Sequence, residues 1–130
     1  MKQIVEKLQK AEAMMTGEKG AFDLFALFLR EDAPNKWDLM IAADWIDQDK
    51  ADAIKYVAGK VQDVLSKEEL LSLSRIVIIE ESNSDLTAFQ ETYTVEHGST
   101  EIQNCNLFGQ QINHAYLITS KRRNSIQTER

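Results

Sequence analysis

Residues 22–42 read FDLFALFLREDAPNKWDLMIA, and this stretch decides the fold of the chain. Its first part is apolar on both alternating faces, which is typical of an interior strand that is covered above and below. A run of turn-forming residues, 31–36, follows, and the apolar pattern resumes at Trp37. The stretch therefore predicts a β-hairpin near the centre of a layered sheet.

Helices are predicted before and after this hairpin. Ile4, Leu8, Ala11 and Met15 form one helical stripe that ends near Thr16-Gly17. A second helix is predicted after Trp45, with Asp47 or Asp49 as its cap. The residues expected to form its buried face are Ala51, Ile54, Ala58, Val61 and Leu65. The run Ser66-Lys67-Glu68-Glu69 has the form of a capping box and predicts a short third helix.

The second half of the chain adds strands to the sheet. Residues 75–80, RIVIIE, predict a buried strand, and a fourth helix that carries Leu86 and Phe89 follows. Two further strands are expected at residues 100–106 and 112–120, at the edge or in the middle of the sheet. We therefore expect one α+β domain over residues 1–120, a mixed sheet of about five strands with an N-terminal helix and further helices packed on it. The length between Trp37 and Ile79 fits a crossover between parallel strands, and residues 121–130 are expected to form a disordered polar tail.

The composition narrows the class of protein. The chain has 130 residues, of which 43% are hydrophobic, and its formal net charge is −6. This acidity argues against nucleic-acid binding, and the one obvious basic run is Lys121-Arg122-Arg123. The single cysteine, Cys105, forms no intramolecular disulfide, and the sequence has no apolar segment of membrane-spanning or signal-peptide type. A cytoplasmic location without membrane contact is therefore expected.

Carboxylates follow two of the predicted strands. Asp44 and Asp47 follow the second strand, and Glu80 and Glu81 follow the strand at residues 75–80. If the two strands are parallel, their carboxyl ends share one sheet edge, and these four residues become candidate ligands for Mg²⁺ or Mn²⁺. Such an ion would suit a hydrolase of phosphate esters or phosphodiesters. The other interpretation is that they are helix caps and a solvated strand end, with no cofactor.

A second polar group lies near the C-terminus. His97, Asn104, Cys105 and His114 are candidates for a polar pocket, in which the thiol and a histidine would pair if the fold brought them together. A buried cysteine, a His-Gly turn and the exposed face of a hairpin explain the same residues without any catalytic role.

Two tryptophans, Trp37 and Trp45, are candidates for an interface, since tryptophan is enriched at binding hot spots. They would equally serve to anchor a helix onto the sheet. The sequence carries no phosphate-binding loop, dinucleotide fingerprint or nucleophile elbow. The primary hypothesis is thus a binding or assembly module that associates with itself or with another protein, and the metal-dependent hydrolase is the alternative. Whether the protein is an enzyme is left open.

Overall fold

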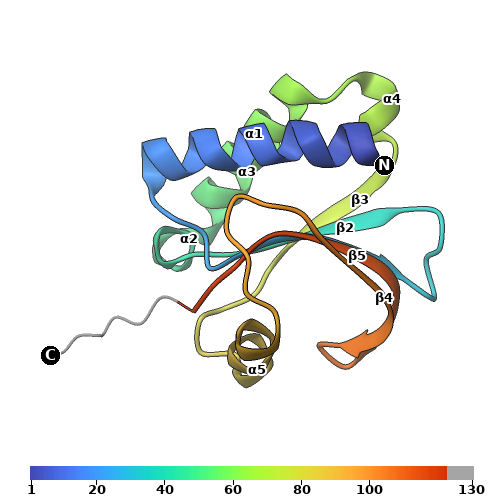
Figure 1. Cartoon of the computed structure of the whole chain (residues 1–130). Helices are drawn as coiled ribbons and strands as arrows, with labels where there is room; N and C mark the ends of the chain where they lie inside the picture. The colour runs from blue at the N-terminus through green and yellow to red at the C-terminus, as the bar shows by residue number, and fades with distance from the viewer. Residues whose placement is uncertain (123–130) are drawn as a thin grey trace, which may run out of the picture.

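The computed structural model describes residues 1–122 as an α+β fold built on one five-stranded mixed sheet (Figure 1). The fold begins with the N-terminal helix, as predicted. The elements follow in the order α1 (Lys2–Lys19), β1 (Leu24–Arg30), β2 (Trp37–Ala42), α2 (Asp44–Gln48), α3 (Lys50–Val64), α4 (Lys67–Leu70), β3 (Leu73–Ile78), α5 (Ser84–Thr92), β4 (Thr100–Leu107) and β5 (Gln110–Ser120). The predicted tail lies mostly at residues 123–130, outside the described residues.

The sheet has the strand order β3-β2-β1-β5-β4. Strand β1 is central, and it pairs antiparallel with β2 on one side and with β5 on the other. Its side chains from Leu24 to Phe28 are buried on both faces, which confirms the prediction of an interior strand. Strands β2 and β3 are parallel, so the predicted crossover is also confirmed.

Two helical layers cover the sheet. Helices α1 and α3 lie on one face and α5 lies on the other (Figure 1). The first core joins Leu8 of α1 and Val57 of α3 to Phe25 of the sheet. The second core joins Leu86 and Phe89 of α5 to the opposite face of the sheet. Because α1 contacts β5 and α3 contacts β3, α3 is the helix that covers the β2–β3 side of the sheet.

Local signals in the sequence set the boundaries of the elements. Asp49 caps α3 by accepting a hydrogen bond from the Asp52 N–H (3.2 Å), so the cap is Asp49 and not Asp47. The capping box is present at α4, where Ser66 and Glu69 exchange hydrogen bonds. The β4–β5 hairpin turns at Phe108 and Gly109, both with positive φ, as a two-residue loop of this hand requires. The same hairpin lies at one side of the sheet, with β4 at its edge.

Two of the sequence predictions are wrong. Strand β3 was expected to be buried, but it is the edge strand opposite β4 and its side chains are half-buried or exposed. The buried face of α3 is formed by Ala53, Val57 and Val61, so the predicted stripe is rotated and part of it faces solvent. The second strand ends at Ala42, and Trp45 lies in α2, so the two tryptophans do not share a strand.

Candidate functional site

The carboxyl ends of β2 and β3 do meet, because these strands are parallel and Ile41 lies beside Ile78. Asp47 in α2 accepts a hydrogen bond from the Glu81 N–H through Oδ2 (3.2 Å). Its other oxygen, Oδ1, is buried and has no hydrogen-bond partner among the described residues. The two chain segments are thus linked directly, and the predicted juxtaposition of carboxylates is present for Asp44, Asp47 and Glu81.

An open pocket of about 510 Å³ lies at this edge of the sheet. We call it the acidic pocket, and it is lined by Lys19, Gly20, Ala21, Asp23, Asp44, Trp45, Gln48 and Glu81. Partial burial, with the nearby charge of Asp44, raises the pKa of Glu81 above its ordinary value. The Trp45 indole N–H donates to the carbonyl oxygen of Gly20 (3.1 Å) and so fixes one wall of the pocket.

Glu80, the fourth predicted ligand, does not join this group. It forms an ion pair with Lys50 at the start of α3, on the far side of the strand end. This pairing lowers the pKa of Glu80 and raises that of Lys50. Within residues 1–122, no three His, Cys, Asp or Glu side chains are arranged to hold a metal ion.

The four residues of the predicted polar pocket do not converge on one site. Cys105 packs in the core under α5, whereas His114 packs against Trp37 on the opposite face of the sheet, so the expected thiol–histidine pair does not form. Burial raises the pKa of the Cys105 thiol, which is the opposite of what an activated nucleophile requires. Asn104 is exposed, with a positive φ, at an irregularity in the β4–β5 pairing.

His97 lies in the loop before β4 and is tied to the N-terminal helix. Its Nδ1 lies 2.6 Å from an oxygen of Glu12, a side chain of α1 that is fully buried. The same carboxylate accepts a hydrogen bond from the Thr119 hydroxyl (2.7 Å). This buried carboxylate therefore joins α1, the loop before β4 and β5. The sequence did not reveal its role because Glu12 looks like an ordinary polar residue of a helix.

The two tryptophans serve the core. Trp37 is buried and packs against His114 and Tyr116 at ring-centroid distances of 5.7 and 5.5 Å. Trp45 packs edge-on against Phe22 and Tyr56. Both belong to the core between the sheet and the α1–α3 layer, so the anchoring interpretation describes their place in the structure.

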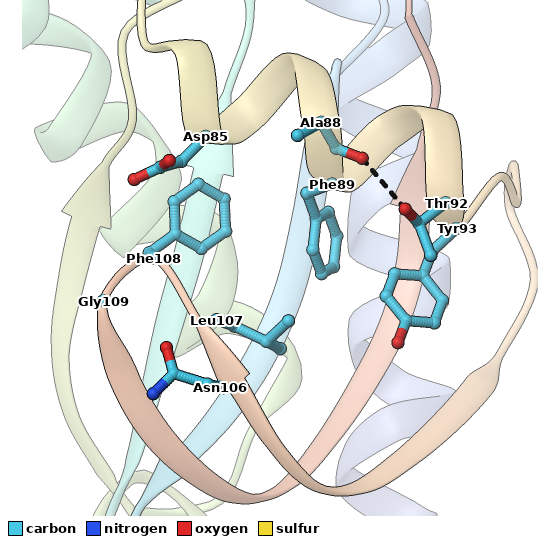
Figure 2. A pocket seen from close by; sticks show the side chains of 9 residues that line it. All are labelled: Asp85, Ala88, Phe89, Thr92, Tyr93, Asn106, Leu107, Phe108 and Gly109. Carbon is cyan, nitrogen blue, oxygen red and sulfur yellow. Dashed lines mark hydrogen bonds between the residues drawn. The ribbon is translucent and has the colours of Figure 1, made fainter.

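A groove of about 360 Å³ separates α5 from the tip of the β4–β5 hairpin (Figure 2). Phe89 and Tyr93 point from α5 toward the hairpin, and Leu107 points back toward them. Phe108 packs on Phe89 with ring centroids 5.5 Å apart, and the Thr92 hydroxyl donates within the helix to Ala88 O (3.1 Å). The groove is therefore a shallow gap between aromatic side chains that pack on one another.

The feature that sequence reasoning misjudged most is the outer side of β3. Leu71, just before the strand, is 69% exposed, and Ile54 of α3 is 37% exposed. Ile54 follows Lys50 by one helical turn, and Lys50 pairs with Glu80 beyond the end of β3, so Ile54 lies on the β3 side of α3. Ala51 is exposed and Ala58 half-buried on the same stripe. We call the outer edge of β3, together with Leu71, Ala51, Ile54 and Ala58, the β3 surface.

In the basic run at residues 121–123, both of the described cations are paired with carboxylates. Lys121 pairs with Glu96 (3.1 Å) and Arg122 with Glu91 (3.1 Å), while Arg123 lies outside the described residues. None of the described helices has the length and apolar character that crossing a membrane requires. A comparison of the chain with protein-family models, curated proteins and solved structures finds no match.

Proposed function

We propose that this protein is a binding module that works in an assembly, and that its binding element is the β3 surface. One observation carries the proposal. The segment Ile76-Val77-Ile78 is continuous, β-branched and apolar on both faces, which α3 and α5 cover, yet β3 has a neighbouring strand on only one side. Monomeric proteins usually protect such edges with charges, prolines or bulges. In β3 the charge, Arg75, and the irregularity in its pairing with β2 both lie before the segment Ile76-Val77-Ile78, which carries neither.

The backbone of β3 offers hydrogen-bonding groups to a further strand. The Ile79 N–H donates inward to Ile41 O (2.9 Å). Since successive N–H groups alternate along a strand, those of Ile76 and Ile78 point away from β2. These two residues therefore present free edge groups beside an apolar strand, which is what addition of a partner strand uses.

The side chains around the edge are suited to a protein partner. Leu71 and Ile54 are two of the four large hydrophobic side chains that are exposed in the described chain. The one charged side chain of β3, Arg75, is already held by buried Asp38 (3.2 Å). A partner strand therefore meets apolar contacts and unpaired backbone groups without an uncompensated charge.

The composition supports the same class of function. The net charge of −6 disfavours nucleic acid as the partner. The single, unpaired cysteine suits a reducing compartment, so the proposal places the protein in the cytoplasm.

Strand addition is tested with a fluorescent peptide that copies residues 71–80, titrated with the full chain. We expect the fluorescence anisotropy to rise and saturate. Binding should weaken by roughly tenfold or more in Ile78→Pro, because proline removes an outward N–H while leaving the β2 ladder intact. Leu71→Lys serves as a second variant at an exposed position, in case the proline variant unfolds.

Met14→Lys is the control, since Met14 is an exposed hydrophobic residue of α1 away from β3. Its affinity for the peptide should equal that of the wild type. A peptide that does not bind the folded chain, or that binds the Leu71→Lys, Ile78→Pro and wild-type chains equally, contradicts the proposed function.

A further inference from the structure

We infer that the partner at the β3 surface is a second copy of this chain, paired through β3 about a two-fold axis. This inference rests on the proposed function and adds the identity and orientation of the partner. It is carried by three features of the β3 surface: the pattern of the strand, the stripe on α3 and the spacing between the two layers.

The strand pattern selects the register. In an antiparallel pair, residues directly opposite each other point to the same face of the sheet. Ile76 and Ile78 pack on the α3 side, and Val77 packs on the α5 side. Two β3 strands whose axis passes through Ile76 therefore place Ile76 opposite Ile76, and Arg75 opposite Val77. This register pairs outward N–H and C=O groups with each other and keeps the two Arg75 side chains from lying directly opposite.

The apolar stripe of α3 is suited to pairing about the same two-fold axis. Ala51, Ile54, Ala58, Val61 and Leu65 recur at alternating spacings of three and four residues, the pattern of a seam between two helices. Only the C-terminal part of this seam is buried within one chain, at Val61 and Leu65. The N-terminal part faces solvent beyond β3. A second helix is the partner that such a seam accepts.

The position of Ala58 along the strand can be derived from the Lys50–Glu80 ion pair. A helix rises about 1.5 Å per residue and a strand about 3.3 Å. The level of Ile76, four residues before Glu80, is therefore reached about nine residues after Lys50, at Ala58 and Gly59. A methyl group added at Gly59 meets no atom within 4 Å in the single chain. In the proposed pair the two helices therefore cross near Ala58 and Gly59, which are small residues.

The spacing of the layers allows this arrangement. Strands lie about 4.8 Å apart and packed helices about 8–10 Å apart, so one helix covers about two strands. Helix α3 covers β2 and β3. Joining two β3 strands therefore sets the two α3 helices side by side at the usual distance, and the interface is isologous, with the same residues contributed by both copies.

Disulfide trapping tests the geometry. Ala58→Cys, made in a Cys105→Ser background, should form a covalent dimer under mild oxidation because the two cysteines face each other near the axis. Met14→Cys in the same background is the matched control and should stay monomeric. The solution mass of the wild-type chain, by light scattering at high concentration, should be twice 14.8 kDa.

The outcomes distinguish the two-fold pair from the strand-binding function. A doubled mass with Ala58→Cys crosslinking supports the two-fold pair. A chain that stays monomeric yet binds the peptide of residues 71–80 overturns the second copy as partner and leaves the strand-binding function standing. A dimer in which Met14→Cys crosslinks as readily as Ala58→Cys overturns the proposed axis. A monomer that does not bind the peptide contradicts both the inference and the proposed function.

Discussion

At the scale of single residues, buried Glu12 links the N-terminal helix to the loop before β4 and to β5. Its carboxylate is fully buried and holds the Thr119 hydroxyl and the His97 ring. Hydrogen bonds to a charged group contribute more than neutral ones, and a buried partner left unpaired is costly.

Replacing this carboxylate by an amide weakens both contacts. We expect Glu12→Gln to lower the free energy of unfolding by about 1–3 kcal/mol. Urea denaturation followed by circular dichroism measures the change. The matched control is Glu6→Gln on an exposed position of the same helix, which should stay within about 0.5 kcal/mol of the wild type. Equal losses in the two variants contradict the role given to Glu12.

Glu81 makes stability depend on pH in the opposite sense from a typical salt-bridged carboxylate. Burial and Asp44 raise its pKa in the folded protein, so the folded state binds the proton more tightly than the unfolded state. Its charge therefore destabilises the fold at neutral pH, and this effect disappears as the pH falls below the ordinary carboxyl pKa.

We expect Glu81→Gln to raise the melting temperature at pH 7 and to leave it unchanged in acid, where the wild-type side chain is neutral as well. Thermal melts at several pH values between these limits measure the difference. A variant that melts below the wild type at pH 7, or above it at all pH values, contradicts this assignment.

The carboxylates also show what residue-level sequence reasoning can reach. The parallel crossover was predictable from length and pattern, and with it the meeting of Asp44 and Asp47 with Glu81. That Glu80 does not join this group was not predictable, because Glu80 pairs with Lys50, and the position of Lys50 follows from the rotation of α3. Likewise, the separation of Cys105 from His114 follows from the irregular pairing at Asn104, which shows no signal in the sequence.

At the scale of elements, the capping box begins α4, the short helix that precedes β3. Ser66 and Glu69 close the first turn, and Glu69 also pairs with Lys7 of α1 (2.7 Å). The cap thus connects the N-terminal helix to the segment that leads into the edge strand.

Removing the cap hydroxyl is expected to cost about 1 kcal/mol of unfolding free energy in Ser66→Ala, because an N-cap side chain satisfies a helix N–H that otherwise has no partner. Ser82→Ala, at an exposed loop position, is the control and should be neutral. Chemical denaturation of both variants measures this difference, and a neutral Ser66→Ala would show that the cap contributes nothing to the fold.

The errors made on β3 and α3 concern neighbouring elements. An apolar pattern shows that the faces of a strand are covered, as α3 and α5 cover those of β3, but it does not show whether a strand lies on each side. The prediction for α3 assumed that a helix buries its whole apolar stripe within one chain. The two departures occur side by side, at Ile76–Ile78 and at Ala51–Ile54–Ala58, and for that reason we interpret them as one surface.

At the scale of the whole molecule, the acidic pocket and the β3 surface lead to different predictions for added metal. The described residues contain no cluster of three potential ligands arranged for an ion, and the proposed binding function predicts that added metal does not stabilise the chain. A ligand present at 100 times its Kd stabilises a protein by about 2.7 kcal/mol, which a thermal melt readily detects.

After treatment with EDTA, we expect the same melting temperature with and without Mg²⁺ or Mn²⁺. A rise that is specific for one ion and is lost in Asp44→Asn, but kept in Glu80→Gln, would instead favour the hydrolase. The two substitutions are matched, because Glu80 pairs with Lys50 and Asp44 lines the acidic pocket.

The most direct test of the central claim is hydrogen exchange at the outward amides of β3, measured by NMR on the wild-type chain in dilute and in concentrated solution. We expect the Ile76 and Ile78 amides to become protected as the concentration rises, while the amides of β4, the opposite edge of the sheet, keep their exchange rates. Unchanged exchange at Ile76 and Ile78 over the whole range, or protection that appears at β4 instead, would contradict assembly through the β3 surface.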